Sequence, residues 1–322
     1  MKKILSADVG GTNSRFGSFQ VDADGELTFL ESICLRTGDA LSFAHLLDKL
    51  KVSDFNLKPE EADIAVLAIA GPVENGTKCS PPFISWDVDI SEVQKYFGLK
   101  WPLLINDFIA QAYACRSVIG EGAELVKPGR LIRDATAAVI GAGTALGKAV
   151  ILPDGKGGHL AIPSEGGHAS FAFESKREYE FQQFLVQEHG DKYITWNKIV
   201  SGRGLSHIHQ FLTGEKFGPE EVISRILPDS ETLEWASRFY GRACRNFALE
   251  TLSVGGVYIT GGVAARTPEL VTSHVFREEF VRSDTMSVLL SNIPVFLIKE
   301  QDAGLWGGAA LGLQKLRESG SL

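Results

Sequence analysis

The sequence contains few cysteines, and they are widely spaced. The four cysteine residues form no Cys-x-x-Cys pair: Cys34, Cys79, Cys115 and Cys244. Structural zinc sites need closely clustered ligands, and disulfide frameworks are typical of short secreted chains. In a chain of 322 residues, this cysteine usage predicts reduced thiols and a cytosolic protein.

A basic excess and a long apolar segment are also absent. The formal net charge of -8 argues against binding to nucleic acid or anionic lipid through bulk electrostatics. No segment approaches the roughly 18 apolar residues of a membrane span. Met1-Lys2-Lys3 is similar to the start of a signal peptide, but Asp8 interrupts the apolar run that follows. We therefore expect a soluble cytoplasmic protein with no nucleic-acid or membrane partner.

The composition is otherwise that of an ordinary globular protein, 44% hydrophobic and 22% charged, with a length that allows two domains. Continuous β-rich apolar runs predict strands that are buried on both faces of a sheet. These runs cover residues 3–7, 63–70, 102–105, 135–140, 256–260 and 294–298. Helical patterns lie between them, at residues 42–51, 107–118 and 230–252. The alternation predicts an α/β fold.

Glycines directly follow three of the predicted strands. They are Gly10-Gly11, Gly141 with Gly143, and Gly261-Gly262. A single pair of this kind is typical of an ordinary tight turn. Three in the same context indicate a ligand site, because ligands gather at the carboxyl ends of strands in open α/β sheets.

Two segments share one plan, namely ILSADVGGTNSRFGSF at 4–19 and AAVIGAGTALGKAVIL at 137–152. Each has an apolar run, a glycine turn with a threonine, and a second strand. This weak repeat suggests a duplicated domain with a cleft between its halves and a boundary near residues 107–117.

The first glycine turn has an acid just before it. The backbone N–H groups of Gly10 and Gly11 and the hydroxyl of Thr12 are suited to a phosphate. Asp8 would repel that phosphate unless a cation lay between them, and Mg²⁺ prefers such oxygen ligands. The alternative is that Asp8 only caps the turn.

The matching turn in the second half contains Gly141, Gly143 and Thr144 and predicts a second phosphate site. A dinucleotide fingerprint is the rival interpretation. It fails because Gly147 breaks the required spacing by one, and because KAVIL predicts a strand where that motif needs a helix.

Two polar pairs carry the remaining candidate chemistry. Asn106-Asp107 ends an apolar run and begins a helix, so Asp107 is either a helix cap or a base that accepts a proton from a substrate hydroxyl. Glu165 and His168 flank a Gly-Gly bend, where they can converge on a small polar ligand such as a sugar. Surface or structural roles are the alternative for this second pair.

Together these stretches resemble the bacterial glucokinases of the sugar kinase/actin/heat-shock-chaperone ATPase superfamily, from residue 4 to about 313. The resemblance rests on the order and spacing of several motifs. They are ADVGGTNSRF, INDFIAQAYA, IGAGTALGKA, SEGGHASFA, VSGRGL, TGGVAAR and AGLWGGAALGL. The Cys-rich zinc loop of the related repressor/kinase group is missing.

The resemblance implies two actin-like (ribonuclease H-like) α/β domains with a cleft between them. The small domain would contain residues 1–115 plus 307–322, and the large domain residues 116–306. The implied reaction is ATP-dependent phosphorylation of D-glucose to glucose 6-phosphate with Mg²⁺, the entry step of glycolysis, and we expect a homodimer.

The resemblance also assigns roles to individual residues. Asp107 would be the base, Asp8 the Mg²⁺ anchor, and Gly261-Gly262 the adenosine motif. The phosphate turns would be Asp8, Gly10, Gly11 and Thr12, then Gly141, Gly143 and Thr144. The sugar ligands would be Asn106, Asp107, Glu165, His168 and Asn197.

Two departures affect the implied sugar site. Asn197 stands where the family usually has Glu, and it is shorter and uncharged. The segment before Trp86, CSPPFISW, lacks a Thr-Asn pair that is frequent in the family. A kinase for another hexose, such as glucosamine or mannose, is therefore the alternative. A DNA-binding regulator and a non-sugar ATPase of the same fold are more distant rivals.

Overall fold

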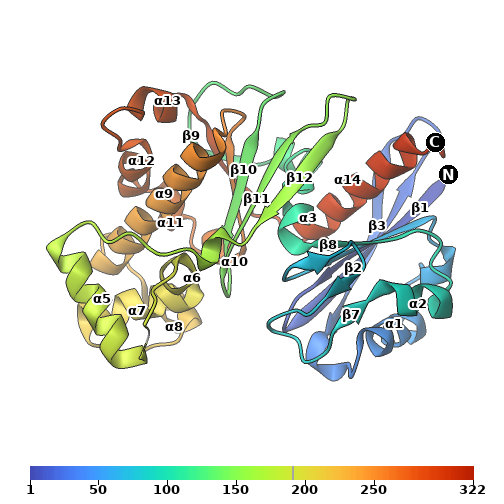
Figure 1. The fold of residues 1–322 in the computed structure, drawn as a ribbon, viewed down its shortest axis with the longest axis horizontal. Coiled ribbons are helices and arrows are strands. Elements are labelled where there is room, and N and C mark those ends of the chain that lie inside the picture. Colours follow the sequence, from blue (N-terminus) through green and yellow to red (C-terminus); the bar gives the residue numbers. More distant parts are fainter. Residues whose placement is uncertain (191) are drawn as a thin grey trace. The chain divides into compact units, whose positions relative to one another are not determined.

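The computed structural model describes residues 1–190 and 192–322, and these form two compact units. Unit 1 contains residues 1–121 and 302–322, and unit 2 contains residues 122–301. Each unit is a mixed sheet flanked by helices (Figure 1), which confirms the predicted α/β class. The domain limits implied by the family, at residues 115 and 307, stay a prediction.

Unit 1 has a mixed sheet with the strand order β3-β2-β1-β4-β8. Its strands are β1 (Lys2–Val9), β2 (Asn13–Val21), β3 (Leu27–Arg36), β4 (Ile64–Ile69) and β8 (Pro102–Asn106). A small second sheet contains β5 (Val73–Glu74), β6 (Lys78–Cys79) and β7 (Val88–Asp89). The helices are α1 (Phe43–Val52), α2 (Ile90–Phe97), α3 (Asp107–Ala114), α4 (Val118–Glu121) and α14 (Ala303–Glu318).

Strand β1 is buried on both faces, which explains its continuous apolar sequence. In Figure 1, α14 and α3 lie on one face of the sheet of unit 1, and α1 and α2 lie on the other. Leu5, Ala7 and Val9 belong to the core that includes α1. The alternate β1 residues face glycines spaced one turn apart on α14: Ile4 meets Gly312, Ser6 meets Gly308 and Asp8 meets Gly304. These glycines let α14 pack directly on β1, with its first turn beside Asp8.

Unit 2 has a mixed sheet with the strand order β12-β11-β10-β13-β14-β9. Its strands are β9 (Glu124–Lys127), β10 (Ala137–Ala142), β11 (Leu146–Pro153), β12 (His159–Ser164), β13 (Val257–Thr260) and β14 (Val295–Leu297). The helices are α5 (Lys176–His189), α6 (Trp196–Ile199), α7 (Gly202–Thr213), α8 (Pro219–Arg225), α9 (Glu231–Thr251), α10 (Gly262–Arg266), α11 (Glu269–Thr272), α12 (His274–Val281) and α13 (Ser287–Asn292). A 3-10 turn, η3 (Gly166–His168), follows β12.

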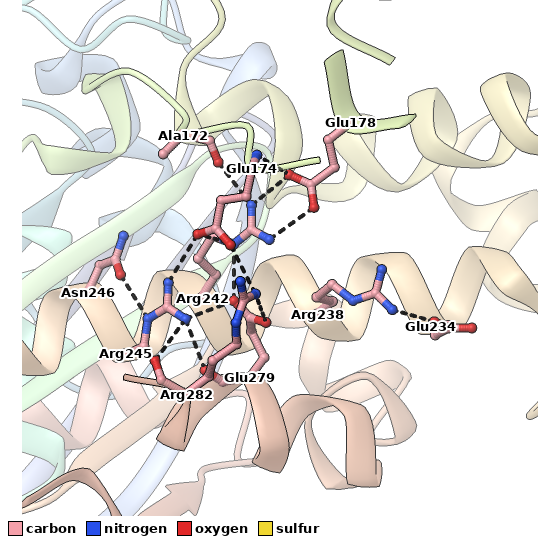
Figure 2. A network of polar contacts seen from close by, with 10 residues as sticks. All are labelled: Ala172, Glu174, Glu178, Glu234, Arg238, Arg242, Arg245, Asn246, Glu279 and Arg282. Carbon is pink, nitrogen blue, oxygen red and sulfur yellow. Dashed lines mark hydrogen bonds and ion pairs between the residues drawn. The ribbon is translucent and has the colours of Figure 1, made fainter. Parts of the chain in front are cut away.

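Helix α9 is the central helix of unit 2. Ser230 caps its start by accepting a hydrogen bond from Leu233 N–H. Its Arg242 is 1% exposed and donates to both carboxylate oxygens of Glu178, at 2.8 and 3.0 Å, and to Glu279 at 3.1 Å (Figure 2). Figure 2 also shows Arg245 reaching Glu279. This buried network joins α9 to α5 through Glu178 and to α12 through Glu279.

Most of the predicted elements are present. The strands predicted at 3–7, 63–70, 102–105, 135–140, 256–260 and 294–298 correspond to β1, β4, β8, β10, β13 and β14. The helix predicted over 107–118 is shorter, since α3 ends at Ala114. The predicted repeat appears as two antiparallel hairpins, β1–β2 and β10–β11. None of the helices in the described part of the chain has the length and apolar character needed to cross a membrane.

Candidate active site

The turn between β1 and β2 is closed by its own backbone and by Thr37. Gly10 N–H donates to Asn13 O at 3.0 Å, and the Thr37 hydroxyl donates to Gly10 O at 2.7 Å. Thr37 N–H donates to Thr12 O at 3.0 Å. Among the described residues, the N–H groups of Gly11 and Thr12 have no such bond, so they are available to an anion.

Asp8 is the next-to-last residue of β1 and lies half-buried beside this turn. Burial raises the pKa of its carboxyl group; Arg15 opposes this shift, and Asp302 adds to it. Arg15 lies opposite Asp8 on β2, and its Nε is 3.7 Å from Asp302 Oδ1. Glycine at residue 304 leaves room for the Asp8 carboxylate, since a Cβ there would lie 2.7 Å from Asp8 Oδ2.

The surroundings of Asp8 fit a magnesium ion held mainly by water and phosphate. Across the described chain, no three His, Cys, Asp or Glu side chains gather to hold a metal by themselves. Mg²⁺ usually takes one or two carboxylates together with waters and substrate phosphates. Asp8, with Asp302 nearby, supplies this donor set. A carboxyl group with a raised pKa also gains from a cation, because a positive charge favours its ionised form.

Asn106, and not Asp107, is the N-cap residue of α3. Asn106 Oδ1 accepts a hydrogen bond from Phe108 N–H at 2.9 Å, and its Nδ2 donates to Gly71 O at 3.1 Å. Asp107, the first residue of α3, also accepts from Phe108 N–H at 3.0 Å. Asp107 and the Asp8 turn lie at the same end of the sheet, since β1, β4 and β8 are parallel.

In unit 2, the turn between β10 and β11 is held from several sides. Ala142 N–H donates to the Tyr240 hydroxyl at 3.1 Å, and Gly143 N–H donates to Ala145 O at 2.9 Å. Gly143 O in turn accepts from Gly202 N–H at 2.9 Å. Thr144 is exposed at the tip.

Gly261 and Gly262 lie beside this second turn. They follow β13, which pairs in parallel with β10 so that Gly141 is opposite Thr260. Gly261 has φ +91°, and a Cβ there would be 2.7 Å from Ala142 O. A side chain at residue 261 would thus be both strained and crowded, and glycine is needed for the two segments to meet.

The sugar-motif turn is formed by η3 and the residue before it. Glu165 and His168 are both exposed, and His168 Nε2 lies 3.8 Å from Glu165 Oε2. The two side chains therefore present acceptor and donor groups side by side. Asn197, the first departure from the family, is partly buried on α6, and its Oδ1 accepts from Leu146 N–H at 2.8 Å.

Several residues around the site lie outside the sequence-based set. In unit 1 they are Arg15, Asp302 and Gly304. In unit 2, Lys148 is 2% exposed beneath the sugar-motif turn, with Nζ 5.0 Å from the ring centroid of Phe247. Burial lowers the pKa of its ammonium group. In the sequence, the small-residue run AGLWGG could have marked Gly304 as a point of close packing. Pairing across the first hairpin could have placed Arg15 opposite Asp8. Lys148 is a lone lysine in a predicted strand, and no sequence feature marks it as part of the site.

The structure places the predicted residues in two groups. Unit 1 brings together one turn and one polar pair: Asp8, Gly10, Gly11, Thr12, Asn106 and Asp107. Unit 2 brings together two glycine segments and the sugar-motif turn with Asn197: Gly141, Gly143, Thr144, Gly261, Gly262, Glu165 and His168.

Solved structures of sugar kinases share this fold. A glucokinase from an Antarctic psychrotroph has a TM-score of 0.81 and 27% sequence identity, with 98% of this chain and 99% of that chain covered. A ROK-family glucokinase from Streptomyces griseus, solved in complex with glucose and AMPPNP, has a TM-score of 0.62 and 18% identity, with 96% and 98% covered. The predicted two-domain actin-like fold is thereby confirmed.

Sequence relatives also indicate a sugar kinase. A glucokinase of Yersinia enterocolitica is 32% identical over 97% of this chain and 97% of its own length. The family model named Glucokinase matches residues 5–315. The resemblance inferred from the motifs is therefore confirmed, and the chain belongs to the glucokinase family.

Proposed function

We propose that this chain is a hexose kinase that transfers the γ-phosphoryl group of ATP to the 6-hydroxyl of D-glucose, the entry step of glycolysis in the cytoplasm. One observation carries the proposal. In unit 2, the Glu165–His168 pair belongs to a turn that packs, through Gly167, against Leu146 at the end of the β10–β11 turn. Groups suited to sugar hydroxyls are thus adjacent to a turn suited to phosphate. The relatives' names and the AMPPNP-bound neighbour support ATP as the donor.

Asp107 is the proposed base. It would accept the proton of the 6-hydroxyl, while Asn106, Glu165, His168 and Asn197 orient the sugar. Because Asn106 caps α3, the backbone of Asp107 is fixed at the start of a helix. Phosphoryl transfer proceeds through a loose transition state, so positioning and charge neutralisation supply most of the rate.

The glycine turns are the proposed phosphate-binding sites. The turn that contains Gly10, Gly11 and Thr12 would bind phosphate in unit 1, through the N–H groups of Gly11 and Thr12, and the turn that contains Gly141, Gly143 and Thr144 would do so in unit 2. Gly261-Gly262 would lie against the adenosine. Asp8, with Asp302, would hold Mg²⁺. When bound, the ion would neutralise the charge that develops on the phosphate oxygens.

A kinase for another hexose is the second candidate, and Asn197 is the observation that favours it. Its Oδ1 already accepts a hydrogen bond from Leu146 N–H. Asn197 therefore has less acceptor capacity left for a sugar hydroxyl than a free carboxylate would have. A homodimer is proposed as the assembly.

A coupled assay of ADP formation with a sugar panel tests the proposal. We expect kcat/KM to be highest for glucose and at least about tenfold lower for mannose and glucosamine, since a hydroxyl-specific site rejects altered hydroxyls strongly. A higher kcat/KM for mannose or glucosamine would favour the alternative hexose. ATP hydrolysis that ignores added sugar would contradict the kinase proposal altogether.

A further inference from the structure

Asn197 contacts the β10–β11 turn, the second of the two proposed phosphate turns, at the residue where β11 begins. Its Oδ1 accepts a hydrogen bond from Leu146 N–H at 2.8 Å. Leu146 is buried and begins β11, directly after the turn that ends at Ala145. The side chain on α6 therefore fixes the point at which the chain leaves the turn.

This exit point determines where the turn's remaining donors lie. Ala142 N–H is bonded to Tyr240, and Gly143 N–H is bonded to Ala145 O. In the described part of the chain, the N–H groups of Thr144 and Ala145 have no such partner, and they are the ones left for a phosphate. Both lie within two residues of Leu146, so their direction depends on its anchor.

The same oxygen also contacts the sugar-motif turn. Gly167 is buried, and a Cβ at this residue would overlap both Asn197 Oδ1 and Leu146 O. The turn that carries Glu165 and His168 is thus packed directly on the Asn197–Leu146 contact. A displacement of Asn197 would shift both turns, because close-packed interiors transmit displacement.

Asn197 is itself held by its neighbours on the chain. Trp196 N–H donates to Ala169 O at 3.1 Å, and Thr195 forms a β-bridge with Ser170. Trp196 is 5% exposed and packs edge-on against Phe171. The amide group of Asn197 is therefore presented by a rigid support.

We infer that Asn197 is a positioning residue for the nucleotide, which sets the donors of the β10–β11 turn through Leu146 and keeps the sugar-motif turn in register with them. The inference rests on the proposed function, because it takes this turn to be the phosphate site. It adds a role distinct from that of a sugar ligand: Oδ1 faces the protein backbone, which leaves the amide Nδ2 for a hydroxyl.

Calorimetric binding of AMPPNP with Mg²⁺ to the full chain tests this inference. Asn197→Ala removes the acceptor, and we expect the Kd to rise about tenfold, the size of one lost hydrogen bond. Asn197→Asp keeps an acceptor in the same place, and we expect a Kd within about threefold of the wild type. Asn246→Ala is the matched control, since Asn246 is a partly buried amide of unit 2 that is bonded to Arg245; its Kd should equal that of the wild type.

The relative Kd values of Asn197→Ala and Asn197→Asp distinguish a positioning role from an effect of charge alone. A charge effect alone predicts that Asn197→Asp binds the nucleotide more weakly than Asn197→Ala, because a carboxylate repels phosphate. That order, or a wild-type Kd in Asn197→Ala, would overturn the inference.

If thermal melting shows that Asn197→Ala is unfolded, Asn197→Leu takes its place, since leucine fills the space without accepting a hydrogen bond. Turnover of the wild type with glucose is measured in parallel; its absence would refute the proposed function and leave the nucleotide comparison intact.

Discussion

Gly304 lies so close to Asp8 that a methyl group on residue 304 would stand 2.7 Å from the Asp8 Oδ2 atom. Gly304→Ala should therefore displace the carboxylate proposed to hold Mg²⁺. We expect kcat/KM for ATP·Mg to fall at least about tenfold, or more than 1.4 kcal/mol of transition-state stabilisation. Thermal melting should show a folded protein, since alanine is the better helix former.

Gly312→Ala is the control for this prediction. It makes the same change on the same helix, where the Cβ would meet Ile4 Cγ2 at 3.0 Å. This variant should lower the melting temperature without a selective loss of ATP·Mg use. Equal kcat/KM losses in the two variants, in proportion to their stability, would contradict the role given to Gly304.

The buried Arg242–Glu178 pair should be costly to break. Arg242→Met leaves Glu178, which is 3% exposed, without its bidentate partner. We expect the free energy of unfolding to fall by about 3–5 kcal/mol. The double variant Arg242→Met/Glu178→Leu should recover part of this loss, because no unpaired carboxylate remains at residue 178. Urea unfolding followed by circular dichroism measures both.

Arg238 provides the comparison for Arg242. It lies one turn earlier on α9 and pairs with Glu234 at the surface (Figure 2). Its side chain is 32% exposed, and exposed pairs contribute about 0–1 kcal/mol. If Arg238→Met cost as much as Arg242→Met, the loss could not be assigned to a buried charge.

Asp89 should make the stability of unit 1 depend on pH in the acid range. Its hydrogen bonds from Lys78 and Ser91 lower its pKa from 3.8 to about 2. Since the folded pKa is below the unfolded value, this contribution is complete above pH 3.8 and is lost as the pH falls toward 2. The midpoint of urea unfolding, measured at several pH values across this window, should fall less in Asp89→Asn than in the wild type.

Asp89→Ala tests the helix cap separately. Asp89 caps α2 by accepting from Ser91 N–H at 3.0 Å. At neutral pH, Asp89→Ala should cost about 1 kcal/mol of stability, and Asn should cost less because it is also a good cap. A larger cost for Asn than for Ala at pH 7 would show that the cap is unimportant.

The sequence was sufficient for those parts of the molecule that depend on local pattern. Continuous apolar runs predicted β1, β4 and β10 because strands buried on both faces need no polar alternation. The glycine turn after Asp8 was visible because a tight turn and close approach both require glycine. The motif order was enough to identify the family.

The remaining parts depend on contacts between distant segments. No local pattern places Gly304 beside Asp8, since they are brought together by α14 packing on β1. The short reach of Asn197 was visible, but its bond to Leu146 depends on how α6 packs against β11. For Asp107, sequence position left a helix cap and a base as alternatives. The structure gives the cap to Asn106, and this could not be decided without the backbone geometry.

The kcat of Asp107→Asn with glucose and ATP tests the central claim most directly. The variant keeps the shape of the side chain and removes the base. General base catalysis contributes about 10²–10⁴-fold, so we predict a kcat at least about 100-fold below the wild type in a protein with an unchanged melting temperature. A kcat within about twofold of the wild type would contradict the account.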